Sequence, residues 1–277
     1  MGTGDGLMRG LIPRSIQKIA AHKKQLTIEG WTFSMEVEFL EIYNECVRDL
    51  LRTENAYEGE LKHEIKVDGE GRRTVTNLTV KSIDPSNCDA IRDLLTLAAK
   101  RRSTAATDMN AESSRSHSVF TVRMTAKHEG RNQAVHGTLN LVDLAGSERL
   151  NRSNAEGQQA KEAISINKSL SSLTDVFTAI GQKQSHVPFR HSRLTYLLQP
   201  SLSGDGKTLM LVNISPTEAS VQESLCSLRF ASRVNKCELG KAKRSIEELK
   251  HTKSEVGGSK NKRRASKPGS RHVKHKM

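Results

Sequence analysis

Apolar and polar residues alternate along several short segments of the chain, and this period of two predicts β-strands. Residues 33–43 place Met35, Val37 and Phe39 on one face and two glutamates on the other. This is typical of a strand that has one face on the core. Further strands are expected at these segments, the last of which is almost continuously apolar and suits the middle of a sheet: 61–83 (two or three short strands), 118–126, 138–143 and 208–214.

A period of three to four residues predicts helices elsewhere. After Asp84-Pro85, the residues Ile91, Leu94, Leu95 and Ala98 follow the i, i+3, i+4, i+7 spacing of an amphipathic helix, for which Ser86 is the expected N-cap. Other helices are expected at 14–26, 44–52, 160–181, 191–201 and 221–234. Because strands and helices alternate along the chain, the sequence predicts an α/β fold.

Charge divides the 277-residue chain into two parts. The net charge is +13, but residues 236–277 hold 14 basic and only 4 acidic residues, whereas residues 1–235 are close to neutral. From residue 254 onward the chain is also polar and poor in apolar residues, which is typical of disorder. We therefore expect a globular part at 1–235 and a basic, largely disordered tail at 236–277.

Several classes of protein do not fit the composition. No apolar stretch approaches the roughly 20 residues needed to span a bilayer, so no membrane association is expected. The first residues, MGTGDG, lack the charged start and apolar run of a signal peptide. The cysteines are far apart in sequence, which argues against a disulfide framework or a zinc site: Cys46, Cys88, Cys226 and Cys237.

Two loops carry the candidate chemistry. Residues 110–117 (NAESSRSH) place hydroxyls, an arginine and a histidine between a predicted helix and a predicted strand, and residues 143–149 (DLAGSER) follow a predicted strand. Ligands of open α/β sheets bind at the carboxyl ends of strands. Asp143 there could hold the water shell of a magnesium ion, and Gly146 could let the backbone approach a phosphate closely. Taken singly, a loop of either kind is usually a solvated turn.

The two loops occur together and in an order that resembles a known family. NAESSRSH resembles the first switch loop of kinesin motors, and LVDLAGSER at 141–149 resembles the second. Further kinesin-like segments are EIYNECVRDLL, HVPFRHSRLTYLLQPSL, VNISP and SLRFASRVN. The resemblance covers about residues 10 to 235. It implies a kinesin-like motor domain with a central mixed sheet flanked by helices. GW at 30–31 and LKHEI at 61–65 resemble the C-terminal-motor, minus-end-directed branch.

The resemblance implies a role for each residue of a site for ATP and Mg. Ser114 would ligate the metal directly, and Asp143 would bind it through water. Ser113 would position the attacking water. Asn110 would lie near the γ-phosphate, and Gly146 would donate its backbone N–H to that phosphate.

Two charged residues would close the pocket. The resemblance implies that Arg115 and Glu148 form an ion pair only when the γ-phosphate orders both loops, so that the pair acts as a latch. By the same resemblance, four residues would meet the acidic surface of a microtubule, where complementary charge mainly raises the encounter rate: Asn167, Lys168, Arg190 and Arg193.

A motor of this family also needs a P-loop, whose backbone and lysine hold the phosphates. The nearest match, SLSGDGKT at 201–208, starts with Ser instead of Gly. It also follows a predicted helix and precedes a predicted strand, the reverse of a P-loop. We therefore expect an N-terminally truncated motor domain that lacks the first strands and the P-loop, for which turnover by this chain alone is doubtful. The missing strand would lie between 138–143 and 208–214, which predicts unpaired edges and poor solubility.

Three functions remain open at this point. The first is a kinesin ATPase that moves along microtubules, the second a motor-like module that binds microtubules without chemistry, and the third a nucleic-acid binder. The third is the weakest, because the basic tail has no aromatic residues to stack on bases. A motor would act at the cytoskeleton or spindle, with a possible dimer partner through an N-terminal stalk. The basic run from Lys260 to Lys267 could serve nuclear import.

Overall fold

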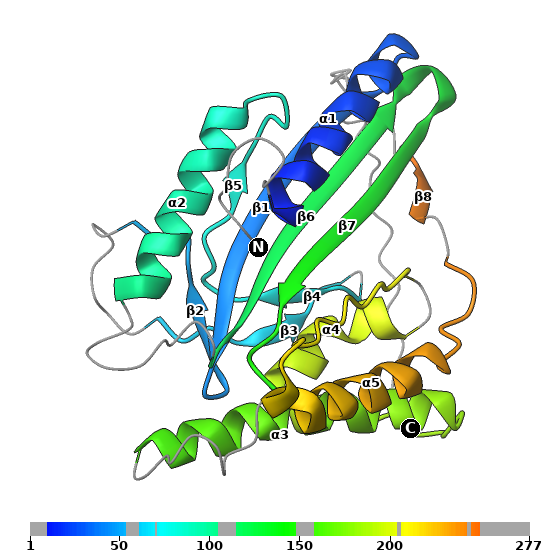
Figure 1. Ribbon diagram of the computed structural model, residues 1–277. Coiled ribbons are helices and arrows are strands. Elements are labelled where there is room, and N and C mark those ends of the chain that lie inside the picture. Colours follow the sequence, from blue (N-terminus) through cyan, green and yellow to red (C-terminus); the bar gives the residue numbers. More distant parts are fainter. Residues whose placement is uncertain are drawn as a thin grey trace, which may run out of the picture.

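A long antiparallel sheet is the centre of the fold (Figure 1). The computed structural model describes residues 10–53, 61–69, 71–104, 115–147, 158–203, 206–242 and 245–249. Its sheet runs β2-β1-β6-β7-β8, with β5 also paired to β1. The strands are β1 (Thr32–Tyr43), β2 (Cys46–Asp49), β5 (Lys81–Ser82), β6 (His117–His128), β7 (Gln133–Asp143) and β8 (Ser245–Glu248).

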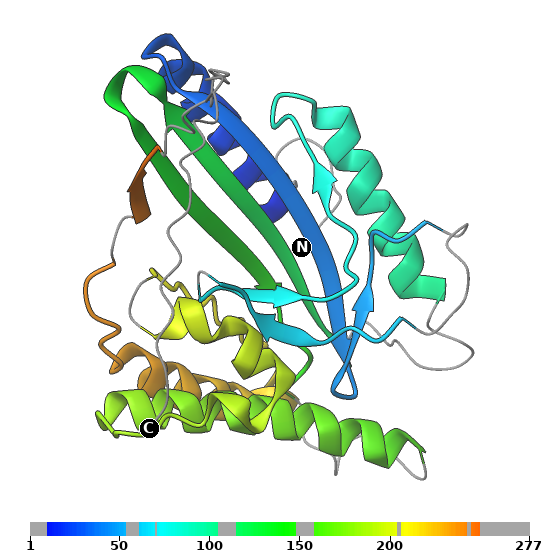
Figure 2. The same cartoon turned by 180° about the vertical axis from the view of Figure 1, so that it is seen from behind.

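Helices cover both faces of this sheet, which confirms the predicted α/β class. Helices α1 (Leu11–Ile28) and α2 (Cys88–Thr104) lie on one face (Figure 1). Seen from behind, α4 (Arg193–Leu202) and the small hairpin of β3 (Ile65–Val67) and β4 (Arg73–Val75) lie on the other face (Figure 2). Helices α3 (Gln158–Gly181) and α5 (Val221–Asn235) run side by side at one end. Short 3-10 turns are η3 (Glu129–Arg131), η5 (Phe189–His191) and η6 (Glu218–Ser220).

The two faces of β1 and β6 pack into two separate hydrophobic cores, because successive side chains of a strand point to opposite faces. Toward α1 and α2 the sheet presents Met35, Val37 and Phe39, and the Phe39 ring meets Phe120 edge-on at 5.3 Å. Toward α3 and α4 the sheet presents the apolar side chains of its other face, among them Leu40. The apolar seam of α3 packs into this second core.

The prediction of a helix at 44–52 was wrong, because the chain makes a tight hairpin there. Asn44 and Glu45 have φ of 49° and 56°, the left-handed values that a two-residue hairpin turn requires. Strand β2 then pairs with the end of β1, with Tyr43 opposite Cys46. The expected N-cap of α2 also shifts by one residue, since the Asn87 side chain accepts the N–H of Ala90 at 3.1 Å, whereas the Ser86 N–H donates to Asp84.

The strand predicted at 208–214 does not form. This segment belongs to no ladder. The expected mixed sheet is also not found, because every pairing among the described strands is antiparallel. A continuously apolar strand is stable only between two neighbours. Within the described part of the chain, the edge of β7 beyond His136 has no such neighbour to offer.

A set of apolar side chains is consequently left exposed. They come from the 208–214 segment and from α5, and their exposed fractions run from 39% to 83%: Leu209, Leu211, Ile214, Val221, Leu225 and Leu228. Isolated apolar residues on a surface need no explanation, but a group from two adjacent segments does. We call this group the apolar surface.

Strand β8 was not predicted from the sequence. It lies in the basic segment after residue 235 and pairs antiparallel with the first residues of β7, placing Ile246 opposite Val135. All four of its side chains are exposed, so the backbone ladder, and not side-chain packing, holds it. No helix of the described residues has both the length and the apolar character to cross a membrane.

Candidate functional site

Strands β6 and β7 bring the two candidate loops to the same end of the sheet. Strand β6 begins at His117, the last residue of the first loop, and β7 ends at Asp143, where the second loop starts. In the ladder between them Ser118 lies opposite Asp143. The sequence pattern predicted that these two loops share a site, and the strand register supports that prediction for the residues that flank them.

Only part of the predicted nucleotide site falls on described residues. Asp143 is the last residue of β7 and its side chain is 46% exposed, Gly146 lies three residues further on, and Arg115 is half-buried just before β6. The other expected members lie outside the described residues: Asn110, Ser113, Ser114 and Glu148. The Arg115–Glu148 latch and the metal role of Ser114 therefore stay predictions.

Asp143 fits the magnesium contact that the resemblance implies. Its carboxylate stands at the end of a strand with nearly half its surface open to solvent, and hard oxygen donors of this kind hold magnesium through its water shell. Among the described residues no group of three or more potential ligands gathers around a metal position. A metal there would depend on water and phosphate oxygens more than on protein ligands.

A buried carboxylate that the sequence analysis missed anchors the first loop. Glu41 of β1 is 2% exposed and accepts a 2.6 Å hydrogen bond from the Ser116 hydroxyl. Arg102 of α2 lies 3.3 Å from the same carboxylate oxygen and 3.8 Å from Asp143. The alternation of β1 could have indicated that Glu41 is buried, because Glu41 lies on the same face of the strand as Met35, Val37 and Phe39.

His117 occupies the opposite face of β6 and joins the second loop to α3. Its Nδ1 accepts the Ala145 N–H at 3.0 Å, and its Nε2 lies 2.7 Å from the Ser169 hydroxyl. Burial lowers the pKa of His117 to about 4, although the nearby charge of Asp143 acts in the opposite direction. The imidazole is therefore neutral near pH 7.

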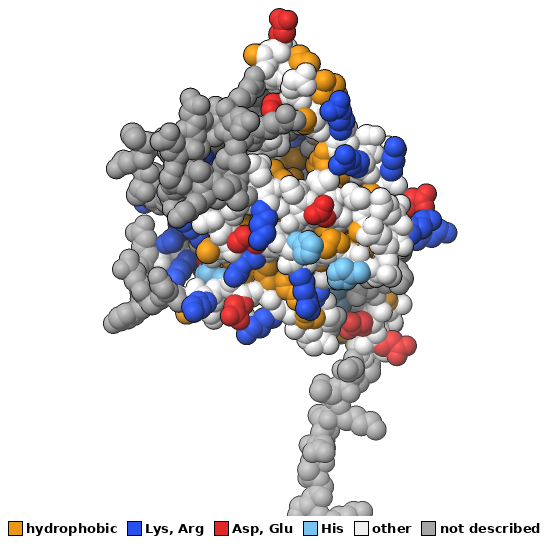
Figure 3. Space-filling model, turned by 90° about the horizontal axis from the view of Figure 1, so that it is seen from below, with side chains coloured by type: hydrophobic (Ala, Val, Ile, Leu, Met, Phe, Trp, Pro, Cys, Tyr) orange, Lys and Arg blue, Asp and Glu red, His pale blue; other side chains and the backbone are white. Residues whose placement is uncertain are grey.

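The four residues predicted to meet a microtubule divide into two kinds. Lys168 on α3 and Arg190 on η5 are exposed, and Asn167 is half-buried. Arg193 is half-buried at the start of α4, where its guanidinium donates to the His63 carbonyl at 3.0 Å, which gives it a structural task as well. Figure 3 shows the face below α3, over which Lys and Arg side chains are spread around centrally placed histidines.

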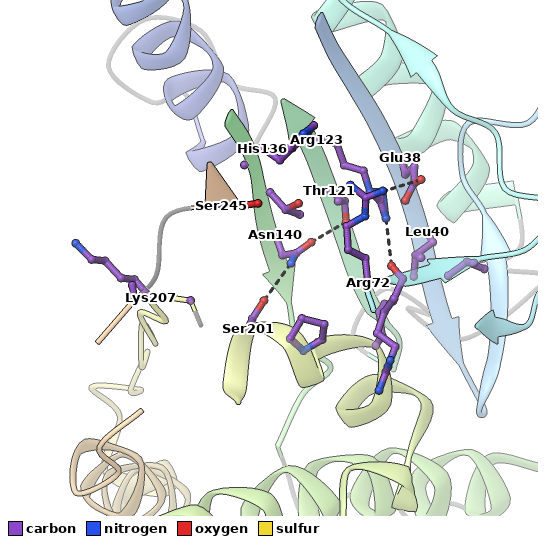
Figure 4. A pocket seen from close by; sticks show the side chains of 18 residues that line it. Glu38, Leu40, Arg72, Thr121, Arg123, His136, Asn140, Ser201, Lys207 and Ser245 are labelled. Atoms are coloured by element: carbon purple, nitrogen blue, oxygen red, sulfur yellow. Dashed lines mark hydrogen bonds and ion pairs between the residues drawn. The ribbon is translucent and has the colours of Figure 1, made fainter. Parts of the chain in front are cut away.

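A separate cavity of about 610 Å³ lies on the sheet face beside α4 (Figure 4). Arg123 in its wall pairs with Glu38 at 2.8 Å, and burial raises the pKa of Glu38 in spite of that arginine. Thr121 donates to Asn140, which in turn donates to Ser201 of α4 at 3.2 Å. Two of these contacts join strands of the sheet to one another, and the contact from Asn140 to Ser201 joins the sheet to α4. None of the predicted site residues lines the cavity.

The segment that most resembles a P-loop behaves as a helix-ending turn. The Thr208 hydroxyl donates to the Ser201 carbonyl at 2.8 Å. Helix α4 ends at Leu202, and among the described residues after it no helix occurs before η6. A phosphate-binding loop needs a helix directly after it, whose N-terminus faces the anion. The geometry thus agrees with the prediction that this segment is not a nucleotide loop.

The fold and the site together define an α/β domain with two loops converging at one end of its central sheet. The family model described as the kinesin motor domain matches residues 1–237, and the chain belongs to that family. The kinesin-like protein KIN-14N of Oryza sativa subsp. japonica is 52% identical over 242 residues, which cover 86% of this chain and 31% of the relative. The chain spans about a third of the length of the curated relatives it matches.

Solved structures agree with this assignment. The motor domain of the kinesin-like protein KAR3 of Saccharomyces cerevisiae is 47% identical with a TM-score of 0.70, and the match covers 82% of this chain and 67% of that one. A KIF14 dimer solved in complex with a microtubule is 33% identical with a TM-score of 0.76, covering 87% and 68%. The KIN-14 and Kar3 names confirm the resemblance to C-terminal-motor kinesins.

Proposed function

We propose that this chain is part of a microtubule motor that couples ATP hydrolysis to movement. The observation that carries the proposal is the meeting of the two loops, expressed in the register of Ser118 with Asp143 and in the bond from the Ala145 N–H to His117. This arrangement lets one bound phosphate contact both loops at once. Membership of the kinesin family supports ATP as the ligand and the microtubule as the filament on which the motor moves.

The residues would divide the work as the resemblance implies. Asp143 and Ser114 would hold magnesium, which when bound neutralises phosphate charge and bridges phosphate oxygens. Gly146 and Asn110 would sense the γ-phosphate, Ser113 would orient the attacking water, and the Arg115–Glu148 pair would close the site. On the outer side the microtubule contacts would come from Lys168 and Arg190, with Asn167 and Arg193 beside them.

We infer further that hydrolysis requires a segment that this chain does not supply. Two observations support this. The related motor structures are covered to only 67% and 68%. Among the described residues, the edge of β7 beyond His136 also has no partner strand, and the apolar surface is exposed. A P-loop and the strand that leads into it would account for both.

Phosphate release and microtubule sedimentation test the proposal. The chain alone and the longer polypeptide encoded by following the reading frame upstream of Met1 are compared with and without microtubules. For a motor, the chain alone sediments with microtubules, and only the longer polypeptide releases phosphate, faster when microtubules are present. Sedimentation without any phosphate release by the longer polypeptide would favour the module without chemistry, and failure of both to sediment would reject the microtubule function.

The remaining predictions on place and assembly also rest on family membership. We propose a location on cytoskeletal microtubules or the spindle, and dimerisation through a stalk N-terminal to the motor. The basic run from Lys260 to Lys267 remains a proposed nuclear import signal. Fusion of residues 250–277 to a fluorescent protein tests that signal, which predicts nuclear accumulation.

A further inference from the structure

Three hydrogen bonds form a continuous path from the second loop to helix α3 through the ring of His117. The Ala145 N–H donates to Nδ1 at 3.0 Å, Nε2 lies 2.7 Å from the Ser169 hydroxyl, and that hydroxyl donates to the Ile166 carbonyl at 2.7 Å. Since Nδ1 accepts, the neutral ring carries its proton on Nε2 and donates it to Ser169. All three bonds therefore point the same way, and each polarises the next.

The polar groups in this path have no access to solvent. His117 is 3% exposed, Ser169 is 2% exposed, and Ala145 is 5% exposed. A buried donor or acceptor that loses its partner cannot replace it with water unless the surroundings open. The loop and the helix are thus linked by a contact that either stays intact or breaks at a cost.

The backbone that carries the ring is fixed, whereas the loop end of the path is not. His117 lies in the β1–β6 ladder opposite Ile42, and the preceding residue, Ser116, is tied to the buried Glu41 on the other face. Ala145 lies two residues beyond the end of β7 and belongs to no ladder. A movement of the second loop therefore changes the distance from Ala145 to the ring and does not carry the ring with it.

We propose that His117 is a positioning residue that transmits the conformation of the second loop to helix α3 through Ser169. The inference rests on the proposed function, because it assumes that the loop responds to nucleotide and that α3 faces the microtubule. A displacement of Ala145 by about 1 Å takes the N–H···N contact beyond hydrogen-bonding distance. Without that bond nothing holds the ring in the tautomer that donates from Nε2 to Ser169, so the contact that ties the turn of α3 around Ser169 to the sheet weakens.

Helix α3 contains a matched control for this path. Ser172 is also buried, at 4% exposed, and its hydroxyl donates at 2.8 Å to the carbonyl of Lys168 in its own helix. Ser169→Ala and Ser172→Ala remove the same atom from the same helix, one turn apart. Only Ser169→Ala interrupts the path to His117.

Amide hydrogen exchange in the 277-residue chain tests the link directly, by mass spectrometry of overlapping peptides across 141–147. Ser169→Ala is expected to speed exchange at Ala145 by about 3- to 10-fold, the factor that corresponds to one lost hydrogen bond. Ser172→Ala is expected to leave it within about 2-fold, as a change that removes no contact to the loop. Equal acceleration by both variants, or none by either, would overturn the proposal.

Two substitutions of the histidine separate the two halves of the path. His117→Asn keeps an acceptor near the Nδ1 position but no longer reaches Ser169, and His117→Gln does the reverse. Exchange at Ala145 is expected to speed up about as much in His117→Asn as in Ser169→Ala, because both lose the contact to Ser169, and to speed up further in His117→Gln, which offers the Ala145 N–H no acceptor. Matching behaviour of the two variants would show that the ring acts only as packing and would contradict the proposal.

Added microtubules distinguish the inference from the proposed function. In the wild-type chain and in Ser172→Ala, binding is expected to change exchange at Ala145 by at least about 3-fold, whereas Ser169→Ala binds without that change. Binding that leaves Ala145 unchanged in the wild type would overturn transmission. Absence of binding would reject the microtubule function instead, and the comparison in the free chain would still decide whether Ser169 controls the loop.

Discussion

Arg102 of α2 and Glu41 of β1 form an ion pair beneath the first loop, with Nε and Oε1 3.3 Å apart and the carboxylate almost wholly buried. The same arginine lies 3.8 Å from Asp143 and 3.3 Å from the Ser116 hydroxyl, so a helix on one face of the sheet contacts the end of the first loop and the start of the second. The pair therefore connects the packing of α2 to the geometry of the site.

Removal of this carboxylate should destabilise the chain strongly. Glu41→Ala removes the buried carboxylate that pairs with Arg102, and the loss of one member of a buried pair costs about 3–5 kcal/mol of unfolding free energy. Urea denaturation followed by circular dichroism measures the loss. Glu36→Ala, on the same strand but exposed, is the control and should cost less than about 0.5 kcal/mol. Similar losses in the two variants would mean that the pair contributes little.

The stability of the chain should fall in acid because of His117. Above pH 6.5 the ring is neutral in both the folded and unfolded chains. As the pH falls from 6.5 toward the folded pKa of about 4, the unfolded chain binds a proton that the folded chain excludes. This lowers the free energy of unfolding by about 3 kcal/mol across that window. Urea midpoints at a series of pH values should therefore fall more steeply for the wild type than for His117→Gln. Parallel curves would refute the assignment.

The apolar surface should make the isolated chain associate with itself. Leu211→Ser and Leu228→Ser each remove an exposed apolar side chain from it, and the double variant should bind less of a hydrophobic dye and show a lower apparent mass in analytical ultracentrifugation. Val67→Ser is a matched control, since Val67 is 49% exposed on the small β3–β4 hairpin, away from this surface. If the control reduces association equally, the apolar surface is not its cause.

Loss of charge near α3 should weaken microtubule binding in a salt-dependent way. Lys168→Ala and Arg190→Ala each remove an exposed cation, and we expect the double variant to bind about 5- to 30-fold more weakly at low salt, since rim charges contribute about 0.5–1 kcal/mol each. The difference should shrink as salt is added. Lys18→Ala on α1, an exposed cation on the other side of the sheet, serves as the control in the same sedimentation assay. Equal weakening by that control would argue against the assigned face.

Periodicity predicted the elements whose partners lie within this chain. The alternation of 33–43 and the helical spacing from Ile91 to Ala98 correspond to β1 and α2 because their buried faces have opposing residues to pack against. It failed at 44–52, where Val47, Leu50 and Leu51 mimic a helical face. The backbone turn at Asn44 and Glu45 decides that segment, and neither residue is glycine, so the turn gave no clear signal.

The candidate site was predictable at the level of motifs but not of contacts. The two loops could be paired from their residue types and family resemblance, whereas Glu41, Arg102 and Ser169 could not, because each acts through a partner that is distant in sequence. At 208–214 the apolar run has the composition of a strand, yet a strand forms only where a neighbouring strand can pair with it. A sequence window cannot reveal whether the neighbour is available.

The first two residues after Arg115 point to opposite layers of the molecule, Ser116 toward α2 and His117 toward α3. Insertion or deletion of a single residue at this junction would exchange them, placing an imidazole against the buried Glu41 and a short hydroxyl where the ring now spans loop and helix. The loop can therefore vary in length only at a distance from β6. Its final step into the sheet is a fixed register on which both layers depend.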